Sequence, residues 1–246
     1  MPPDPSAPPK KKKSPWLYVA LGCGGLLLLG GLAIAAIVLV FLKKADEVSD
    51  DMANPIARTE KVKKALGAQT LPDGYHAVMT ISIPMLMDTT VISTKDPSKG
   101  SDGASSKRMF MYIRLRSATA RDAQDMRDYL EGRTDDDSAF ARSKLQLKTE
   151  QIVGRGPLEL PNGQKLLYLS QRGELHFGSN NKKGEPGLNA LVLFECPTQS
   201  DVRMGIWTTP DTSPEVPLEQ LDLKGTPVDP EAIRSFMSHF NPCQVN

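Results

Sequence analysis

The 246-residue chain carries 30 Lys and Arg against 29 Asp and Glu, and its net charge of +1 hides an uneven distribution. Residues 45–246 hold 24 of the basic residues and 28 of the acidic ones, a net charge of −4, so the positive excess lies near the N-terminus. Because phosphate-backbone binding draws on a concentrated basic surface, this balance argues against nucleic acid as a partner.

Residues 1–15 form a leader in which six prolines accompany the four lysines Lys10–Lys13. Such a composition favours extended, solvated chain and does not bury a core. The lysines are expected to contact anionic lipid, and the prolines can also present a polyproline surface to a cytoplasmic partner.

Residues 16–42 form an uncharged run of 27 residues, from Trp16 to Leu42. At about 1.5 Å per residue, a helix of this length exceeds the roughly 30 Å hydrocarbon core of a bilayer. A cleaved signal peptide has an apolar region of only about 7 to 15 residues. A lipoprotein signal would end at Cys23, but apolar residues continue well beyond it. The run length therefore predicts an uncleaved transmembrane helix.

Lysines flank this span unequally, with four before it and two, Lys43 and Lys44, directly after it. Because positive charge is retained on the cytoplasmic side, we expect a single-pass protein of the cell (inner) membrane. Its N-terminus would be cytoplasmic and its C-terminal domain periplasmic or extracellular. Two small-residue pairs, Ala20 with Gly24 and Gly31 with Ala35, would allow a weak homodimer, and the alternative is an inert tether.

Residues 43–70 are predicted to form a juxtamembrane linker with a stalk helix that can dock on the globular domain. Asn54 is a preferred N-cap, Pro55 suits the first helical position, and Gly67 suits the position just past the end. The turn that follows introduces a globular domain over residues 71–246.

Within residues 71–246, apolar periodicity predicts seven strands, over residues 75–83, 85–92, 108–116, 145–153, 165–177, 189–196 and 201–209. Segment 189–196 is apolar on both faces and should lie centrally in the sheet. A helix is expected over 120–131, with Thr119 and Asp122 as a capping box, and another begins after Asp229. The fold class is therefore α+β, a mostly antiparallel sheet packed with a central and a C-terminal helix.

The sequence Leu-Pro-x-Gly-Tyr at 71–75, the central helix and the closing helix at 229–236 resemble the PsbP/Mog1-like sandwich group. The resemblance lies in the order of elements over residues 71–242. That group includes soluble or tethered binding and assembly factors, so the resemblance implies a binding role and carries over no catalytic residues.

A search for reaction chemistry finds no motif. His76, His176 and His239 are widely separated, and none has a metal-ligand spacing to another ligand type. The acidic run 135–137 suits capping of a short helix better than a calcium loop, whose alternating spacing is absent. We therefore expect no catalytic residue, no cofactor and no metal.

Four side chains, Phe110, Tyr112, Arg114 and Arg116, alternate along one side of the strand predicted over 108–116. Aromatic and arginine side chains together are typical of partner surfaces, so this set is a candidate interaction surface. The alternative is a sheet face covered by a helix.

Cys196 and Cys243 are the two cysteines of the predicted extracytoplasmic domain, where they can oxidise to a disulfide. The alternative is two buried thiols. Five methionines of the early strands are expected in the core, because methionine fills irregular gaps: Met79, Met85, Met87, Met109 and Met111.

These features predict a membrane-anchored protein whose non-catalytic extracytoplasmic domain binds or scaffolds an envelope component. Its partners would be the lipid bilayer, through Trp16 to Leu42, and a protein of the envelope. The alternative is a membrane-tethered enzyme with a site assembled from scattered residues. A sensor with the leader as its output is disfavoured by the shortness of that leader.

Overall fold

A computed structural model describes residues 54–97, 108–142, 145–177, 186–197 and 201–244, with the backbone alone at 145–148 and 175–177. These residues belong to one of two units into which the chain divides, Asp50–Asn246. The predicted membrane span, Trp16 to Leu42, lies outside them. Among the described ranges, no helix has both the length and the apolar character that crossing a bilayer requires.

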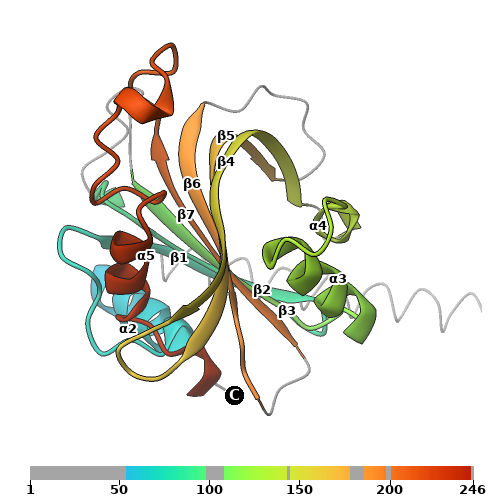
Figure 1. Ribbon diagram of the computed structural model, residues 1–246. Helices are drawn as coiled ribbons and strands as arrows, with labels where there is room; N and C mark the ends of the chain where they lie inside the picture. The colour runs from blue at the N-terminus through green and yellow to red at the C-terminus, as the bar shows by residue number, and fades with distance from the viewer. Residues whose placement is uncertain (1–53, 98–107, 143–144, 178–185, 198–200, 245–246) are drawn as a thin grey trace, which may run out of the picture. The chain divides into compact units, whose positions relative to one another are not determined.

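The described residues contain a seven-stranded sheet in the order β1-β2-β3-β7-β6-β5-β4 (Figure 1). All six neighbouring pairs are antiparallel, which confirms the predicted α+β class. The strands are β1 (His76–Ile83), β2 (Met87–Ser93), β3 (Met109–Leu115), β4 (Leu145–Glu159), β5 (Lys165–Phe177), β6 (Gly187–Phe194) and β7 (Val202–Pro210).

The chain builds this sheet from two meanders. After β3 it passes through α3 (Ala120–Leu130) and α4 (Ser138–Arg142) to the far edge strand β4, and then returns strand by strand to β7. The two meanders join where β3 pairs with β7, so that Phe110 lies opposite Trp207. Strand β6, whose one polar side chain is Asn189, is buried throughout between β5 and β7, as predicted.

Helices cover both faces of the sheet (Figure 1). On one face, α2 (Pro55–Leu66) and α5 (Pro230–Met237) pack over an aromatic cluster in which Trp207 stacks on Phe236 at 4.3 Å between ring centroids. On the other face, α3 and α4 bring Met126 and Phe140 against strands β5 to β7. Both faces of the central strands are therefore buried.

Local side-chain chemistry sets the helix ends where the sequence predicts them. Asn54 Oδ1 accepts hydrogen bonds from the amides of Ile56 and Ala57, and Gly67 ends α2 with a left-handed φ of 61°. The capping box of Thr119 and Asp122 is present at α3.

Helix α2 belongs to the folded domain. Val62 and Leu66, four residues apart on one side of the helix, are buried in the core that α2 shares with β1 and α5. The helix predicted as a stalk thus docks on the sheet through this apolar stripe, within the unit Asp50–Asn246.

Strand β4 is longer than the predicted segment 145–153. Irregularities in its pairing with β5 occur between Thr149 and Gln151 and between Ile152 and Gly154, and the β4–β5 pair bends strongly (Figure 1). β-bulges of this kind break the alternation from which a strand is recognised. Pro157 is tolerated because β4 is an edge strand, where one side of the backbone needs no partner.

Candidate functional site

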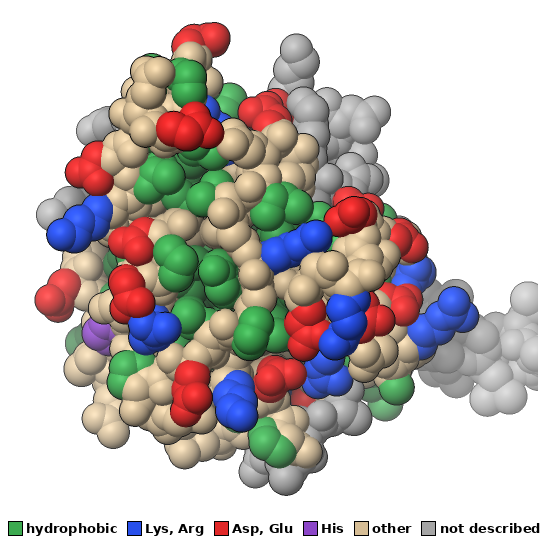
Figure 2. Space-filling view, viewed as in Figure 1, with side chains coloured by type: hydrophobic (Ala, Val, Ile, Leu, Met, Phe, Trp, Pro, Cys, Tyr) green, Lys and Arg blue, Asp and Glu red, His purple; other side chains and the backbone are tan. Residues whose placement is uncertain are grey.

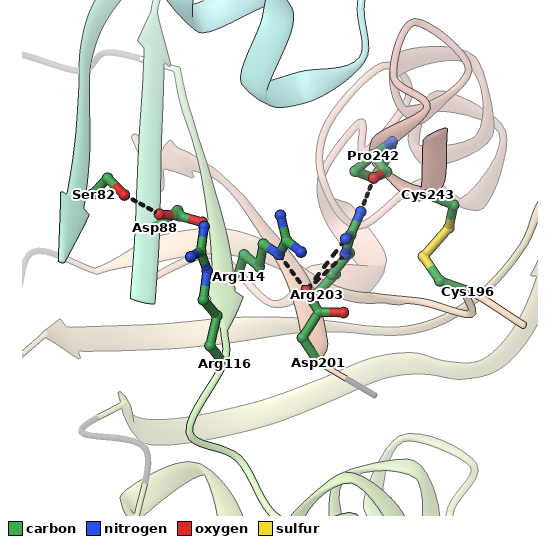
Figure 3. A network of polar contacts seen from close by, with 9 residues as sticks. All are labelled: Ser82, Asp88, Arg114, Arg116, Cys196, Asp201, Arg203, Pro242 and Cys243. Carbon is green, nitrogen blue, oxygen red and sulfur yellow. Dashed lines mark hydrogen bonds and ion pairs between the residues drawn. A yellow bond between two sulfur atoms is a disulfide. The ribbon is translucent and has the colours of Figure 1, made fainter. Parts of the chain in front are cut away.

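A row of polar side chains crosses the sheet from β1 to β7 (Figure 3). The strand pairing sets Ser82 opposite Asp88, Asp88 opposite Arg114, and Arg114 opposite Arg203. Asp88 accepts hydrogen bonds from the hydroxyl of Ser82 and, at 2.6 Å, from Nη2 of Arg116. Asp88 thus lies beside arginines, whereas Arg114 and Arg203 are like charges placed opposite each other.

Asp201 joins the two arginines at the end of this row. Its Oδ2 accepts hydrogen bonds from Nε of Arg114 and, at 3.2 Å, from Nη2 of Arg203. Burial raises the pKa of Asp201, but the hydrogen bonds and charges of the two arginines outweigh burial and lower this pKa below its ordinary value. The side chain of Arg203 is fully buried, and its Nη1 donates to the carbonyl of Pro242. The network therefore fixes the C-terminal segment to the sheet.

The candidate interaction surface is not exposed, and this prediction is wrong for its aromatic half. Phe110 and Tyr112 are only 1% and 2% exposed, because α5 covers this face of β3. Arg114 and Arg116 carry ion pairs with acidic residues of neighbouring segments. Burial raises the pKa of Tyr112 to about 12, so its hydroxyl stays neutral. The alternative, a sheet face covered by a helix, describes these residues.

The structure contains a disulfide between Cys196 and Cys243 (Figure 3). The bond links the segment just after β6 to the short 3-10 helix Pro242–Gln244. Because Arg203 binds the neighbouring carbonyl of Pro242, the C-terminal segment is held by a covalent and a polar link side by side.

The remaining candidates from the sequence do not converge on one centre. His76 begins β1, His239 lies in the turn after α5, and the side chain of His176 lies outside the described residues. In the acidic run 135–137, Asp136 accepts from the amide of Ser138 at the start of α4. Across the described ranges, no group of three histidine, cysteine or acidic side chains is arranged to hold a metal.

Most of the five methionines lie at the margin of the core. Met85 is 86% exposed in the turn between β1 and β2, where its φ is 65°, so its predicted core position is wrong. Met79, Met87, Met109 and Met111 are partly buried.

A cavity of about 450 Å³ lies beside α2 and the start of β1. Arg58 and Lys63 of α2 line it together with Thr70, Tyr75 and His76. Figure 2 shows acidic and basic side chains beside one another over α3 and α4, and at the cavity Lys63 likewise pairs with Glu60 at 2.9 Å. The cavity combines cationic groups, hydroxyls and an imidazole, which makes it a candidate binding pocket.

Tyr75 connects this pocket to the aromatic core. Its hydroxyl accepts a hydrogen bond from the indole Nε1 of Trp207 at 2.8 Å, and its ring lies 5.1 Å from that of Phe236. Burial raises the pKa of Tyr75, while the bond from Trp207 and the charge of Arg108 lower it less. The hydroxyl is therefore fixed in position and protonated at neutral pH.

Arg58 was not among the candidates predicted from the sequence, although its spacing holds a signal. Arg58 precedes Val62 and Leu66 at intervals of four, so it falls on the apolar stripe of α2 and is only 7% exposed. A charged residue in the core-facing register of an amphipathic helix is unusual, and this departure could have directed attention to the pocket.

No family model, no curated protein and no solved structure matches the chain. The resemblance to the PsbP/Mog1-like group therefore stays a prediction.

Proposed function

We propose that this chain is a single-pass membrane protein whose C-terminal domain lies outside the cytoplasm and binds a component of the cell envelope without catalysing a reaction. The uncharged run from Trp16 to Leu42 and the lysines before it support the anchor and its orientation. A disulfide between Cys196 and Cys243 suits an oxidising compartment.

The pocket beside α2 carries the binding part of this proposal. Its volume lies within the range of small-molecule sites, and its lining includes Arg58, Lys63, which is paired with Glu60 at 2.9 Å, and Tyr75. The β1 side of the pocket is paired with β2 from His76 to Ile83, with one irregularity between Ala77 and Met79. A site placed on regular elements keeps its donors in position before the ligand arrives.

Site-specific photo-crosslinking in intact cells tests the proposal. A photoreactive residue replaces Thr70, which is exposed at the pocket, and the matched control replaces Arg121, which is exposed on α3. We expect one discrete adduct, identified by mass, from position 70 and none from position 121. Identical adducts from both positions, or none from either, would contradict a binding role for this pocket.

A further inference from the structure

We propose that the turn between β1 and β2 inserts its apolar side chains into the lipid bilayer and so holds the domain against the membrane surface. The turn has the sequence Ile-Pro-Met-Leu at residues 83–86 and is called the apolar tip. The inference rests on the membrane anchor proposed above and adds a second contact between the chain and the bilayer.

The apolar tip exposes large hydrophobic side chains where a turn more often carries Gly, Asn, Asp or Ser. Met85 is 86% exposed and Leu86 is 52% exposed, and Ile81, shortly before them on β1, is 38% exposed. Single exposed apolar residues are ordinary, but these three lie within six positions, and residues 77–87 carry no charge. Exposed apolar side chains gathered in this way indicate contact with an apolar partner.

The backbone of the apolar tip is strained at Met85. The amide of Leu86 donates to the carbonyl of Ile83 at 3.1 Å, so Pro84 takes the second position of the turn and Met85 the third. Met85 has a φ of 65°, and within the described ranges it is the one residue other than glycine with a positive φ. Glycine or asparagine fits this position at a lower steric cost. A strained backbone under an exposed apolar side chain indicates a function for that side chain.

The turn between β4 and β5 provides a comparison within the same sheet. It also carries a proline, Pro161, but it continues with Asn162 and Gly163, and the positive φ of 78° falls on the glycine. The side chain of Asn162 accepts a hydrogen bond from the amide of Gln164 at 3.0 Å. This turn follows ordinary turn chemistry, so it serves as the control for the apolar tip.

Polar contacts hold the base of the apolar tip (Figure 3). Asp88 accepts from the hydroxyl of Ser82 and from the guanidinium of Arg116, and the amide of Arg116 donates to the carbonyl of Leu86 at 2.9 Å. The charges of Asp88 and Arg116 cancel each other. Insertion should therefore depend on apolar contact and only weakly on the charge of the lipid.

The membrane lies within reach of the apolar tip if the proposed anchor is correct. Residues 43–54 connect Leu42 to α2, and a connection of that length reaches at most about 45 Å. A compact domain of the size of Asp50–Asn246 is roughly 40 Å across. Any part of its surface can therefore meet the bilayer that holds the anchor.

A bilayer suits the apolar tip better than a protein partner does. A stable protein interface engages about 20 to 30 residues on each side, and the apolar tip with Ile81 offers only a few side chains. A lipid layer takes up a few apolar side chains without a matching surface, because its hydrocarbon is fluid and apolar throughout.

Lipid quenching of a fluorophore on the full chain tests the proposal. In a Cys23→Ser background, Met85→Cys carries a bimane label, and the matched control carries the same label at Asn162→Cys in the β4–β5 turn. Both chains are reconstituted in phosphatidylcholine vesicles that contain lipids with a spin label on the acyl chain. We expect quenching at position 85 and none at position 162. Replacing half of the lipid by phosphatidylglycerol should not change this result.

Leu86→Asp should lower the ratio of inserted to withdrawn tips, read from quenching at position 85, by about tenfold or more, because a carboxylate is unfavourable in hydrocarbon. The matched control is Asn162→Asp, which adds the same charge to the β4–β5 turn and should leave that quenching unchanged. If Leu86→Asp fails to fold, Met85→Asn suits the positive φ and gives the same comparison with the label at Leu86→Cys.

Three results would overturn the proposal: no quenching at position 85, equal quenching at positions 85 and 162, and quenching that Leu86→Asp leaves unchanged. A disulfide-linked dimer of unlabelled Met85→Cys without lipid quenching would assign the apolar tip to a second copy of the chain, and would overturn it as well. In all these cases the chain still floats with the vesicles, so the anchor stands. A chain that carbonate removes from the vesicles contradicts the anchor and this inference together.

Discussion

Removing the disulfide should lower the free energy of unfolding by about 4 kcal/mol. Cys196 and Cys243 are separated by 47 residues, and chain-entropy theory assigns a loop of that size roughly 14 cal/mol/K. The native fold should persist in Cys243→Ser, because Arg203 still binds the carbonyl of Pro242 and α5 remains packed in the core. The effect then acts chiefly on the unfolded chain.

Denaturant unfolding of the full chain in maltoside micelles measures this difference. Unfolding is monitored by the near-ultraviolet circular dichroism of the tryptophans. Cys23→Ser is the matched control, since it removes a thiol that takes no part in the bond. Reductant should lower the stability of the wild type and leave Cys243→Ser unchanged. A loss below about 1 kcal/mol, or an equal loss from Cys23→Ser, would refute the reasoning.

Three further predictions follow from individual contacts. Gly205→Ala should lower the free energy of unfolding in chemical denaturation by about 1–3 kcal/mol, because a Cβ there would lie 2.7 Å from the ring of Phe110. The control is Gly163→Ala, which has open space around it and so reports backbone strain alone. Asp201→Asn should cost about 3 kcal/mol at pH 7. Folding lowers the pKa of Asp201, so the ionised carboxylate stabilises the fold above the unfolded pKa, and this stabilisation is lost as pH falls through the folded pKa. The free energy of unfolding of Asp201→Asn should therefore fall less in acid than that of the wild type. A variant with the same pH dependence as the wild type would contradict this. Thr119→Ala should lower the free energy of unfolding by about 1 kcal/mol, because it removes the N-cap of α3. It should also raise the pKa of Asp122 from about 2 in an NMR titration, because the hydrogen bond from the Thr119 hydroxyl does most to lower that pKa. An unchanged pKa of Asp122 would contradict the cap.

Features set by neighbouring residues could be predicted from the sequence. The caps at Asn54 and Asp229 depend on side chains that accept hydrogen bonds from amides two or three positions later, and the stop at Gly67 depends on a left-handed φ that glycine adopts readily. The central place of β6 followed from the absence of a polar side on that strand. These signals need no knowledge of distant segments.

Features that depend on distant segments were not predictable in the same way. Phe110 and Tyr112 alternate with methionines as a half-exposed strand would, and only the packing of α5, more than a hundred residues later, buries them. The hydrogen bond from Arg203 to the carbonyl of Pro242 likewise forms only because the C-terminal segment returns to the sheet.

The pocket shows a third case, in which the sequence held a signal of its own. Arg58 interrupts an apolar stripe that Val62 and Leu66 continue, and Lys63 and Tyr75 join it only through the turn between α2 and β1. The unusual position of Arg58 could be seen in the sequence, but the residues that line the pocket with it could be identified only from the fold.

The membrane anchor is the central claim, and the intact mass of the mature chain in fractionated cells tests it most directly. The account predicts a chain that retains residues 16–42 and stays in the membrane pellet after alkaline carbonate extraction. A mature chain that begins beyond Leu42 and is recovered in the soluble fraction would contradict it.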